Sequence, residues 1–211
     1  MKLPLFKKII PLLAIAFSLL FSSPYAAVAS LEKAVLAGGC FWCLEHDLEE
    51  LPGILSVESG YTGGNLQNPT YKNHKGHQEA VIVEFDTKKI AFDKLLRSYW
   101  RNIDPFDSRG QFCDRGDSYR PVIFARDDSQ LKESIESLSF ASKELSASID
   151  DIKVEIKNAN KFWQAEDYHQ NFAENNNLKY QFYRYSCGRD KRLNEVWGST
   201  SRKDLPWSIN N

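Results

Sequence analysis

The 211-residue sequence contains almost no methionine and little cysteine. Met1 is the only methionine, and four cysteines are too few for a scaffold that depends on many disulfides. Neither sign of charge dominates, since 27 Lys and Arg stand against 28 Asp and Glu. A nucleic-acid binder usually carries a clear basic excess, so we expect no nucleic-acid partner. With 42% hydrophobic residues, the chain is too apolar to be disordered.

Only one stretch is apolar over a long run, and it lies at the N-terminus. Lys2, Lys7 and Lys8 form a positive start, residues 9–21 are almost entirely apolar, and residues 27–29 read Ala-Val-Ala. This pattern indicates a secretory signal peptide over residues 1–29. The alternative is an uncleaved membrane anchor, but the apolar run falls short of the roughly 20 residues that span a bilayer.

Residues 30–211 are therefore expected to form one exported domain, because no repeat, low-complexity tract or linker divides them. Removal of the three signal-peptide lysines leaves 24 basic and 28 acidic residues, a net charge of −4. Such a balance is typical of an ordinary protein surface. We expect a monomer with no stable membrane association once the signal peptide has been cleaved.

The hydrophobic patterns predict a domain of mixed secondary structure. Short apolar or alternating runs predict strands at residues 33–37, 54–61, 80–85, 121–125 and 152–156. Amphipathic spacing predicts helices at residues 41–51, 92–103, 129–146 and 165–175. The stretches 62–76 and 104–117 are expected to be long loops, which usually carry function in a compact domain. This order predicts an α+β fold with helices packed on a sheet.

The most informative motif is Gly38-Gly39-Cys40-Phe41-Trp42-Cys43, which follows a predicted strand and begins a predicted helix. Backbone N–H groups at a helix N-terminus favour negative charge. We therefore expect the Cys40 thiol to ionise easily and to act as a nucleophile. Cys43 lies one helical turn further on, within reach of a disulfide with Cys40 after modest unwinding.

A CxxC pair by itself is compatible with other chemistry. A zinc site needs a second pair at similar spacing, whereas Cys113 and Cys187 are isolated. Haem attachment needs a histidine directly after the second cysteine, where this chain has Leu44. A general thiol–disulfide oxidoreductase and a non-catalytic binding module stabilised by a disulfide are the two alternative functions, although Phe and Trp between the cysteines fit a thioredoxin-type pair poorly.

The chain resembles the A-type peptide methionine sulfoxide reductases in the order of its motifs. The blocks that carry the resemblance are 38–43, 51–53, 60–64, 68–71, 76–81, 104–105, 111–120 and 165–170. They extend over roughly residues 33 to 185, nearly the whole predicted domain. The resemblance implies a two-layer α/β sandwich, a mixed sheet with a ferredoxin-like core. It also implies reduction of methionine-S-sulfoxide, free and in proteins, with no metal or organic cofactor.

Four residues match the family's reacting groups. The resemblance implies that Cys40 attacks the sulfoxide sulfur and that Glu79 protonates the oxygen. A partly buried carboxyl has a raised pKa, which suits this role. Tyr71 and Tyr119 match two tyrosines that bind the same oxygen, and phenols keep their protons at neutral pH.

Three further residues match the walls of the family's pocket. Asp114 corresponds to an acid that orients a tyrosine or a water molecule. Phe41 and Trp42 correspond to the residues that hold the methyl group of the substrate. An apolar wall facing polar donors suits a sulfoxide, which has one face of each kind.

Other residues that attract notice are expected to be structural. His74 and His77 flank a Gly-rich loop without a carboxylate at metal-binding spacing, so we interpret them as loop residues. His169 is expected to pack within a helix. Trp163 and the aromatic residues of 180–185 are expected to belong to the core.

The resemblance also implies how the enzyme is regenerated. Cys40 becomes a sulfenic acid, with which a second thiol condenses to form a disulfide. We expect Cys43 to be this resolving cysteine, with Cys187 as the alternative, because many family members resolve from the C-terminal segment. Many members also have Gly where Cys43 stands, so this chain departs from the commoner pattern. Cys113 is expected either to pair with Cys187 or to be a buried free thiol.

A reductant must complete the cycle, and the resemblance implies a thioredoxin-like dithiol donor. An exported protein has no direct access to the cytosolic pool of such donors. We therefore expect the bacterial periplasm, where a membrane-relayed or local donor could supply electrons.

Overall fold

The structure, a computed structural model, describes residues 30–203 and 205–207. The expected signal peptide, residues 1–29, lies outside the described residues. Within the described ranges, no helix combines the length and the apolar character needed to cross a bilayer.

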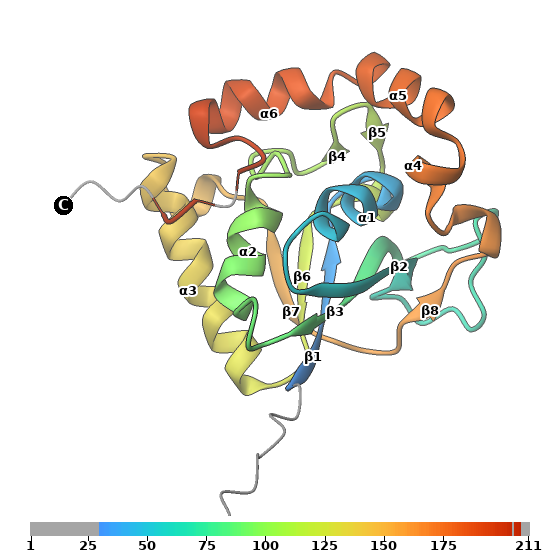
Figure 1. Ribbon diagram of the computed structural model, residues 1–211, viewed down its shortest axis with the longest axis horizontal. Helices are drawn as coiled ribbons and strands as arrows, with labels where there is room; N and C mark the ends of the chain where they lie inside the picture. Colours follow the sequence, from blue (N-terminus) through green and yellow to red (C-terminus); the bar gives the residue numbers. More distant parts are fainter. Residues whose placement is uncertain (1–29, 204, 208–211) are drawn as a thin grey trace, which may run out of the picture.

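Six strands form one mixed sheet in the order β7-β6-β1-β3-β2-β8 (Figure 1). They are β1 (Leu31–Ala37), β2 (Ile54–Thr62), β3 (Gln78–Asp86), β6 (Val122–Ala125), β7 (Glu155–Asn158) and β8 (Trp163–Gln164). Neighbouring strands are antiparallel except β6 and β7. The four central strands and their two connecting helices follow the βαββαβ order of a ferredoxin-like fold. The predicted α+β class and its ferredoxin-like core are confirmed.

Helices cover the sheet and one of its ends (Figure 1). They are α1 (Phe41–Glu49), α2 (Phe92–Trp100), α3 (Asp128–Glu144), α4 (Phe172–Asn175), α5 (Asn177–Ser186) and α6 (Arg189–Trp197). The main core lies between the sheet and helices α1 to α3 and contains Leu36, Leu44, Val83, Phe85, Leu96, Trp100 and Ile123. No methionine contributes to this core, since Met1 is the only one in the sequence. Helices α5 and α6 cross the end of the sheet where β1 finishes (Figure 1).

Most predicted elements are present within a few residues of their expected ends, but two differ in kind. The strand expected at 152–156 is displaced, because residues 149–151 form a 3₁₀ turn and β7 begins only at Glu155. The helix expected at 165–175 is broken into a 3₁₀ turn, Asp167–His169, and the short α4. Asn171 interrupts it with a φ of 51°, a left-handed conformation that no right-handed helix can include.

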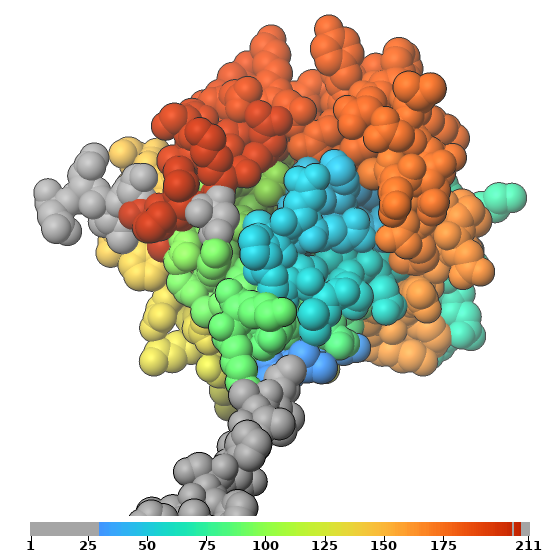
Figure 2. Space-filling view, viewed as in Figure 1, coloured from blue at the N-terminus to red at the C-terminus, as the bar shows by residue number. Residues whose placement is uncertain are grey.

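The C-terminal region differs most from the expectation. The aromatic residues of 180–185 lie on α5, a helix that the sequence patterns did not predict. Tyr180 is fully buried, but Phe182 and Tyr185 are 74% and 87% exposed. The interpretation of the whole group as core is therefore wrong, because α5 lies at the surface (Figure 2) and turns these two rings toward solvent. The expected loop 104–117 also contains a small hairpin of β4 (Gly110–Gln111) and β5 (Asp114–Arg115).

Candidate active site

One small pocket at the N-terminus of α1 gathers residues from widely separated parts of the chain. Its volume is about 50 Å³, and it is lined by Cys40, Phe41, Trp42, Tyr71, Glu79, Asp114, Tyr119 and Tyr183. About 10–15 Å³ of such space holds one water molecule, so the pocket has room for a few water molecules or for the end of a side chain. The structure thus brings together the seven pocket residues expected from the sequence and adds Tyr183.

Two glycines place Cys40 between β1 and α1. A Cβ atom on Gly38 would lie 2.7 Å from Ile103, and one on Gly39 would lie 2.6 Å from Gln111. Gly39 also has a φ of +85°, which side chains disfavour. The chain therefore turns sharply after β1, and the Cys40 carbonyl accepts the first bond of the helix from the Cys43 N–H at 3.1 Å.

Burial reverses the ionisation that the sequence predicts for Cys40. The residue is only 6% exposed, and burial raises the pKa of its thiol, with Cys43 and Glu79 acting in the same direction. The first N–H group of α1, that of Phe41, donates to Glu79 Oε2 at 3.2 Å. The prediction of an easily ionised Cys40 is therefore wrong for this pocket, because burial disfavours the thiolate and the first N–H group of α1 is bonded to Glu79 rather than to the sulfur.

Glu79 has the character expected of a proton donor. It lies on β3, is 2% exposed, and burial raises its pKa to about 8. The Phe41 N–H and the Tyr119 hydroxyl oppose this rise, whereas the charge of Asp114 adds to it. At neutral pH the Glu79 carboxyl is therefore mostly protonated, in contact with the segment that carries Cys40.

Tyr71 reaches the pocket from the loop between β2 and β3, and Tyr119 reaches it from the 3₁₀ turn Asp117–Tyr119. The backbone N–H of Tyr71 donates to Glu166 Oε1 at 2.9 Å, and Glu166 Oε2 accepts from the Tyr61 hydroxyl at 3.0 Å. Glu166 thereby fixes the loop between β2 and β3. Burial raises the pKa of both Tyr71 and Tyr119, so their phenols stay protonated and can donate hydrogen bonds.

His169 supports the aromatic wall of the pocket from behind. Its Nδ1 accepts from Trp42 Nε1 at 3.1 Å, and its ring lies 4.9 Å from Phe41 and 4.6 Å from Tyr71 between centroids. Phe172 stacks on the indole of Trp42 at 3.6 Å. His169 is thus a packing residue, as expected, although it lies in a 3₁₀ turn rather than in a continuous helix.

His74 and His77 are both loop residues in the structure. His77 is buried, and its Nε2 lies 2.9 Å from the carbonyl oxygen of Leu66, across the loop that precedes β3. The Gly64 N–H donates to the other ring nitrogen of His77 at 3.3 Å. His74 lies 3.1 Å from the carbonyl oxygen of Thr70 in the same loop.

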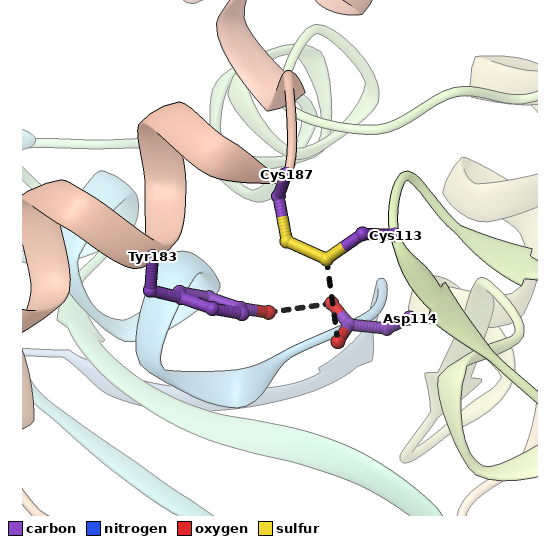
Figure 3. The surroundings of a disulfide bond; sticks show 4 residues. All are labelled: Cys113, Asp114, Tyr183 and Cys187. Carbon is purple, nitrogen blue, oxygen red and sulfur yellow. Dashed lines mark hydrogen bonds between the residues drawn. A yellow bond between two sulfur atoms is a disulfide. The ribbon is translucent and has the colours of Figure 1, made fainter.

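Tyr183 is the pocket residue that the sequence did not reveal. It lies on α5, and its hydroxyl donates to Asp114 Oδ2 at 2.6 Å (Figure 3). Its ring also meets the edge of Trp42, with centroids 5.8 Å apart. Asp114, expected to orient a tyrosine, is thus bonded to a tyrosine other than Tyr71 and Tyr119. Dense aromatic composition was the only local signal for Tyr183.

The four cysteines form two pairs of different kinds. Cys113 and Cys187 are joined by a disulfide with a Cα–Cα distance of 4.9 Å (Figure 3). Cys113 is therefore not the buried free thiol that was one of two expectations. Cys40 and Cys43 are free and buried. Within the described ranges, the donor group that is compact enough for a metal is Cys113, Asp114 and Cys187, and its two sulfurs are bonded to each other.

A free thiol that faces a neutral carboxyl and several phenols, with a second free thiol one helical turn away, defines a thiol-dependent reductase. The thiols can supply electrons, while the carboxyl and the phenols can supply protons and hydrogen bonds to an oxygen atom. The neutral, confined pocket suits a small polar group on an otherwise apolar side chain.

Comparison with known proteins identifies the family. The family model for peptide methionine sulfoxide reductase matches residues 32–201. The peptide methionine sulfoxide reductase MsrA 2 of Caulobacter vibrioides is 47% identical over 197 residues, 91% of this chain and 99% of that protein. The MsrA of Bacillus subtilis is 44% identical, covering 80% of this chain and 97% of its own.

Solved structures agree with this identification. Methionine sulfoxide reductase A of Corynebacterium diphtheriae superimposes with a TM-score of 0.64 at 28% identity, over 70% of this chain and 76% of its own. Mxr1 of Saccharomyces cerevisiae in reduced form gives a TM-score of 0.65 at 28% identity, over 70% and 86% of the two chains. This chain belongs to the peptide methionine sulfoxide reductase family. It is an A-type enzyme, a peptide-methionine (S)-S-oxide reductase.

Proposed function

We propose that the enzyme repairs oxidised proteins and free methionine-S-sulfoxide through Cys40, with Glu79 as the proton donor. The observation that carries this assignment is the neutral Glu79 carboxyl, bonded to the Phe41 N–H beside the buried Cys40 thiol. Both groups are protonated before substrate binds, so the pocket carries the proton that the sulfoxide oxygen needs.

In the first step, the sulfur of Cys40 attacks the sulfoxide sulfur. Negative charge then develops on the oxygen, which receives the proton of Glu79 and hydrogen bonds from Tyr71 and Tyr119. The hydroxyl then moves from the substrate sulfur to the Cys40 sulfur as the bond between the two sulfurs breaks, so methionine leaves reduced by two electrons and Cys40 is left oxidised as a sulfenic acid. The thiol proton of Cys40 restores Glu79, so the step balances without an external proton. Phe41 and Trp42 form the apolar surface against the methyl group of the substrate.

Cys43 is the proposed resolving residue. Cys43 lies one helical turn from Cys40, and each thiol shifts the pKa of the other. Cys43 is also free, whereas the sulfur of Cys187 is already bonded to Cys113. Condensation of the Cys43 thiol with the sulfenic acid releases water and forms a Cys40–Cys43 disulfide.

A thioredoxin-like dithiol donor is proposed to reduce this disulfide. We propose that the mature enzyme is a monomer in the bacterial periplasm, without stable membrane association, after cleavage of the signal peptide at Ala29. Cys40 and Cys43 are 6% and 1% exposed, so a protein donor must open the pocket or act on an unwound start of α1.

A chiral assay tests the activity. The mature protein should reduce methionine-S-sulfoxide, leave the R epimer, and reduce insulin disulfides poorly, because its dithiol is buried. After one equivalent of sulfoxide, mass spectrometry should map a Cys40–Cys43 disulfide. A Cys40–Cys187 bond would move the resolving role to Cys187, and insulin reduction without sulfoxide turnover would replace the assignment by a general thiol–disulfide oxidoreductase.

A further inference from the structure

The Cys113–Cys187 disulfide joins two segments that each supply a polar residue to the pocket. Cys113 directly precedes Asp114, the first residue of β5. Cys187 follows α5, and its N–H donates to the carbonyl oxygen of Tyr183 at 2.9 Å, one helical turn earlier. The disulfide links residues 74 positions apart in the sequence and lies next to the Asp114–Tyr183 hydrogen bond (Figure 3).

The disulfide and the tyrosine approach the same carboxyl group. Asp114 Oδ2 accepts the Tyr183 hydroxyl at 2.6 Å, and Asp114 Oδ1 lies 3.9 Å from the sulfur of Cys113. Both Asp114 and Tyr183 line the pocket that contains Cys40. A shift of either segment would therefore change the polar part of the pocket wall.

The small hairpin that carries Asp114 is tied to its surroundings through both strands, and Arg115 of β5 forms an ion pair with Asp107. The side chain of Gln111, on β4, accepts from the Asp104 N–H and donates to the Asp104 carbonyl, both at 2.8 Å. On the β5 side, the covalent link to Cys187 ties the hairpin to α5. Gly110 begins β4 and Gly116 follows β5, and both have a positive φ, which glycine adopts without strain.

We propose that the Cys113–Cys187 disulfide is a positioning element for sulfoxide binding, which holds the Tyr183 hydroxyl on Asp114 in the pocket wall. This inference rests on the proposed function, because it concerns the same pocket. Cys113, Cys187 and Tyr183 act through the placement of the Asp114 carboxyl and take no part in electron transfer. A disulfide that only stabilised the fold would leave substrate affinity unchanged.

A double-mutant cycle separates these two roles. The variants are Tyr183→Phe, Cys113→Ser/Cys187→Ser and their combination, each studied in single turnovers without an external reductant. Tyr183→Phe should raise the half-saturating sulfoxide concentration about tenfold, the scale of one lost hydrogen bond to a carboxylate, with a smaller change in maximal rate. Cys113→Ser/Cys187→Ser should raise it similarly. The combination should add nothing, because residues acting through one contact are not additive.

Two results would overturn the proposal. One is an unchanged half-saturating concentration in Cys113→Ser/Cys187→Ser, and the other is a roughly hundredfold rise in the combination, which would mean independent effects. Ser137→Ala is a matched control for lost stability, because it removes the buried hydroxyl that accepts from Trp100 Nε1 at 2.9 Å, away from the pocket. Ser137→Ala should lower the melting temperature and leave the half-saturating concentration unchanged.

A second measurement separates failure of this inference from failure of the proposed function. If the wild type does not reduce methionine-S-sulfoxide, the proposed function fails, and the same cycle is measured as the rate of Cys40 alkylation by iodoacetamide. The positioning role is supported if Tyr183→Phe and Cys113→Ser/Cys187→Ser change the alkylation rate equally and their combination changes it no further. Shifts that multiply, or no shift in Cys113→Ser/Cys187→Ser, contradict it.

Discussion

The two cysteine pairs of this enzyme differ in almost every property. Cys40 and Cys43 are three residues apart, buried and free, whereas Cys113 and Cys187 are 74 positions apart and bonded. The first pair lies at the start of a helix, where a disulfide requires the helix to unwind locally. The second pair links two surface segments, with Cys113 itself exposed. Closeness in sequence thus does not decide which cysteines bond, and burial keeps the nearer pair available as a reductant.

Loss of the Cys40 sulfur should have the largest effect. Cys40→Ser should lower methionine-S-sulfoxide reduction at least about a thousandfold, because a hydroxyl cannot replace the thiol as nucleophile and electron source. The assay measures methionine formed by the mature protein with excess dithiol. The matched variant Cys113→Ser should reduce methionine-S-sulfoxide at a rate within roughly tenfold of the wild-type rate. Substantial turnover by Cys40→Ser would remove the distinction between the two pairs.

Loss of the Cys43 sulfur should slow the regeneration of reduced Cys40 but should leave the rate of the first turnover unchanged. Cys43→Ser should form about one equivalent of methionine at a normal rate, whereas steady-state turnover with a protein dithiol donor falls on the order of a hundredfold. Dimedone should then label Cys40 as a sulfenic acid, as detected by mass spectrometry. A normal steady state in Cys43→Ser would show that another thiol resolves Cys40.

Removal of the Glu79 proton should slow the chemical step. Glu79→Gln keeps an acceptor for the Phe41 N–H but cannot donate a carboxyl proton, so single-turnover reduction should fall about a hundredfold. Wild-type activity should decline as the pH rises through about 8, where Glu79 loses its proton. Glu79→Gln should not show this decline. If the variant keeps the wild-type pH profile, the decline is caused by another titrating group.

The same carboxyl should make stability depend on pH. The pKa of Glu79 is raised to about 8 in the fold, so the folded state retains a proton that the unfolded chain releases near pH 4.3. The stabilisation that Glu79 gives the folded state through this proton is fully present below about pH 4.3 and is lost as the pH rises through about 8. Glu79→Gln avoids this loss, so its melting temperature relative to the wild type should increase between pH 5 and pH 9. A constant difference across this range would contradict a buried, neutral Glu79.

The bonded pair should matter more for stability than for chemistry. Cys113→Ser/Cys187→Ser should lower the free energy of unfolding by about 2–4 kcal/mol, since the bond closes a long loop in the unfolded chain. Urea denaturation measures the difference. The matched control is the wild type after chemical reduction of the Cys113–Cys187 disulfide, which should lose a similar amount, and an unchanged free energy of unfolding in Cys113→Ser/Cys187→Ser would contradict the prediction.

The sequence predicted the residues of the pocket better than it predicted the C-terminal region, where α4 and α5 cover the pocket. Ordered motifs identified Cys40, Glu79 and Asp114, because each lies in a compact block at a strand or loop end. Tyr183 and the contact of His169 with Trp42 depend on how α4 and α5 return over the pocket, a path that no local pattern encodes. The ionisation of Cys40 was also mispredicted, because the helix start is visible in the sequence and the desolvation of the sulfur is not.

The core without methionine, described with the fold, has a consequence for survival under oxidation. An oxidant that damages thioethers in client proteins finds none in the described domain, where Leu, Val, Phe and Trp fill the interior. Of the sulfur atoms it can meet, two are shielded and two are already joined. The repair machinery therefore resists the injury that creates its own substrates.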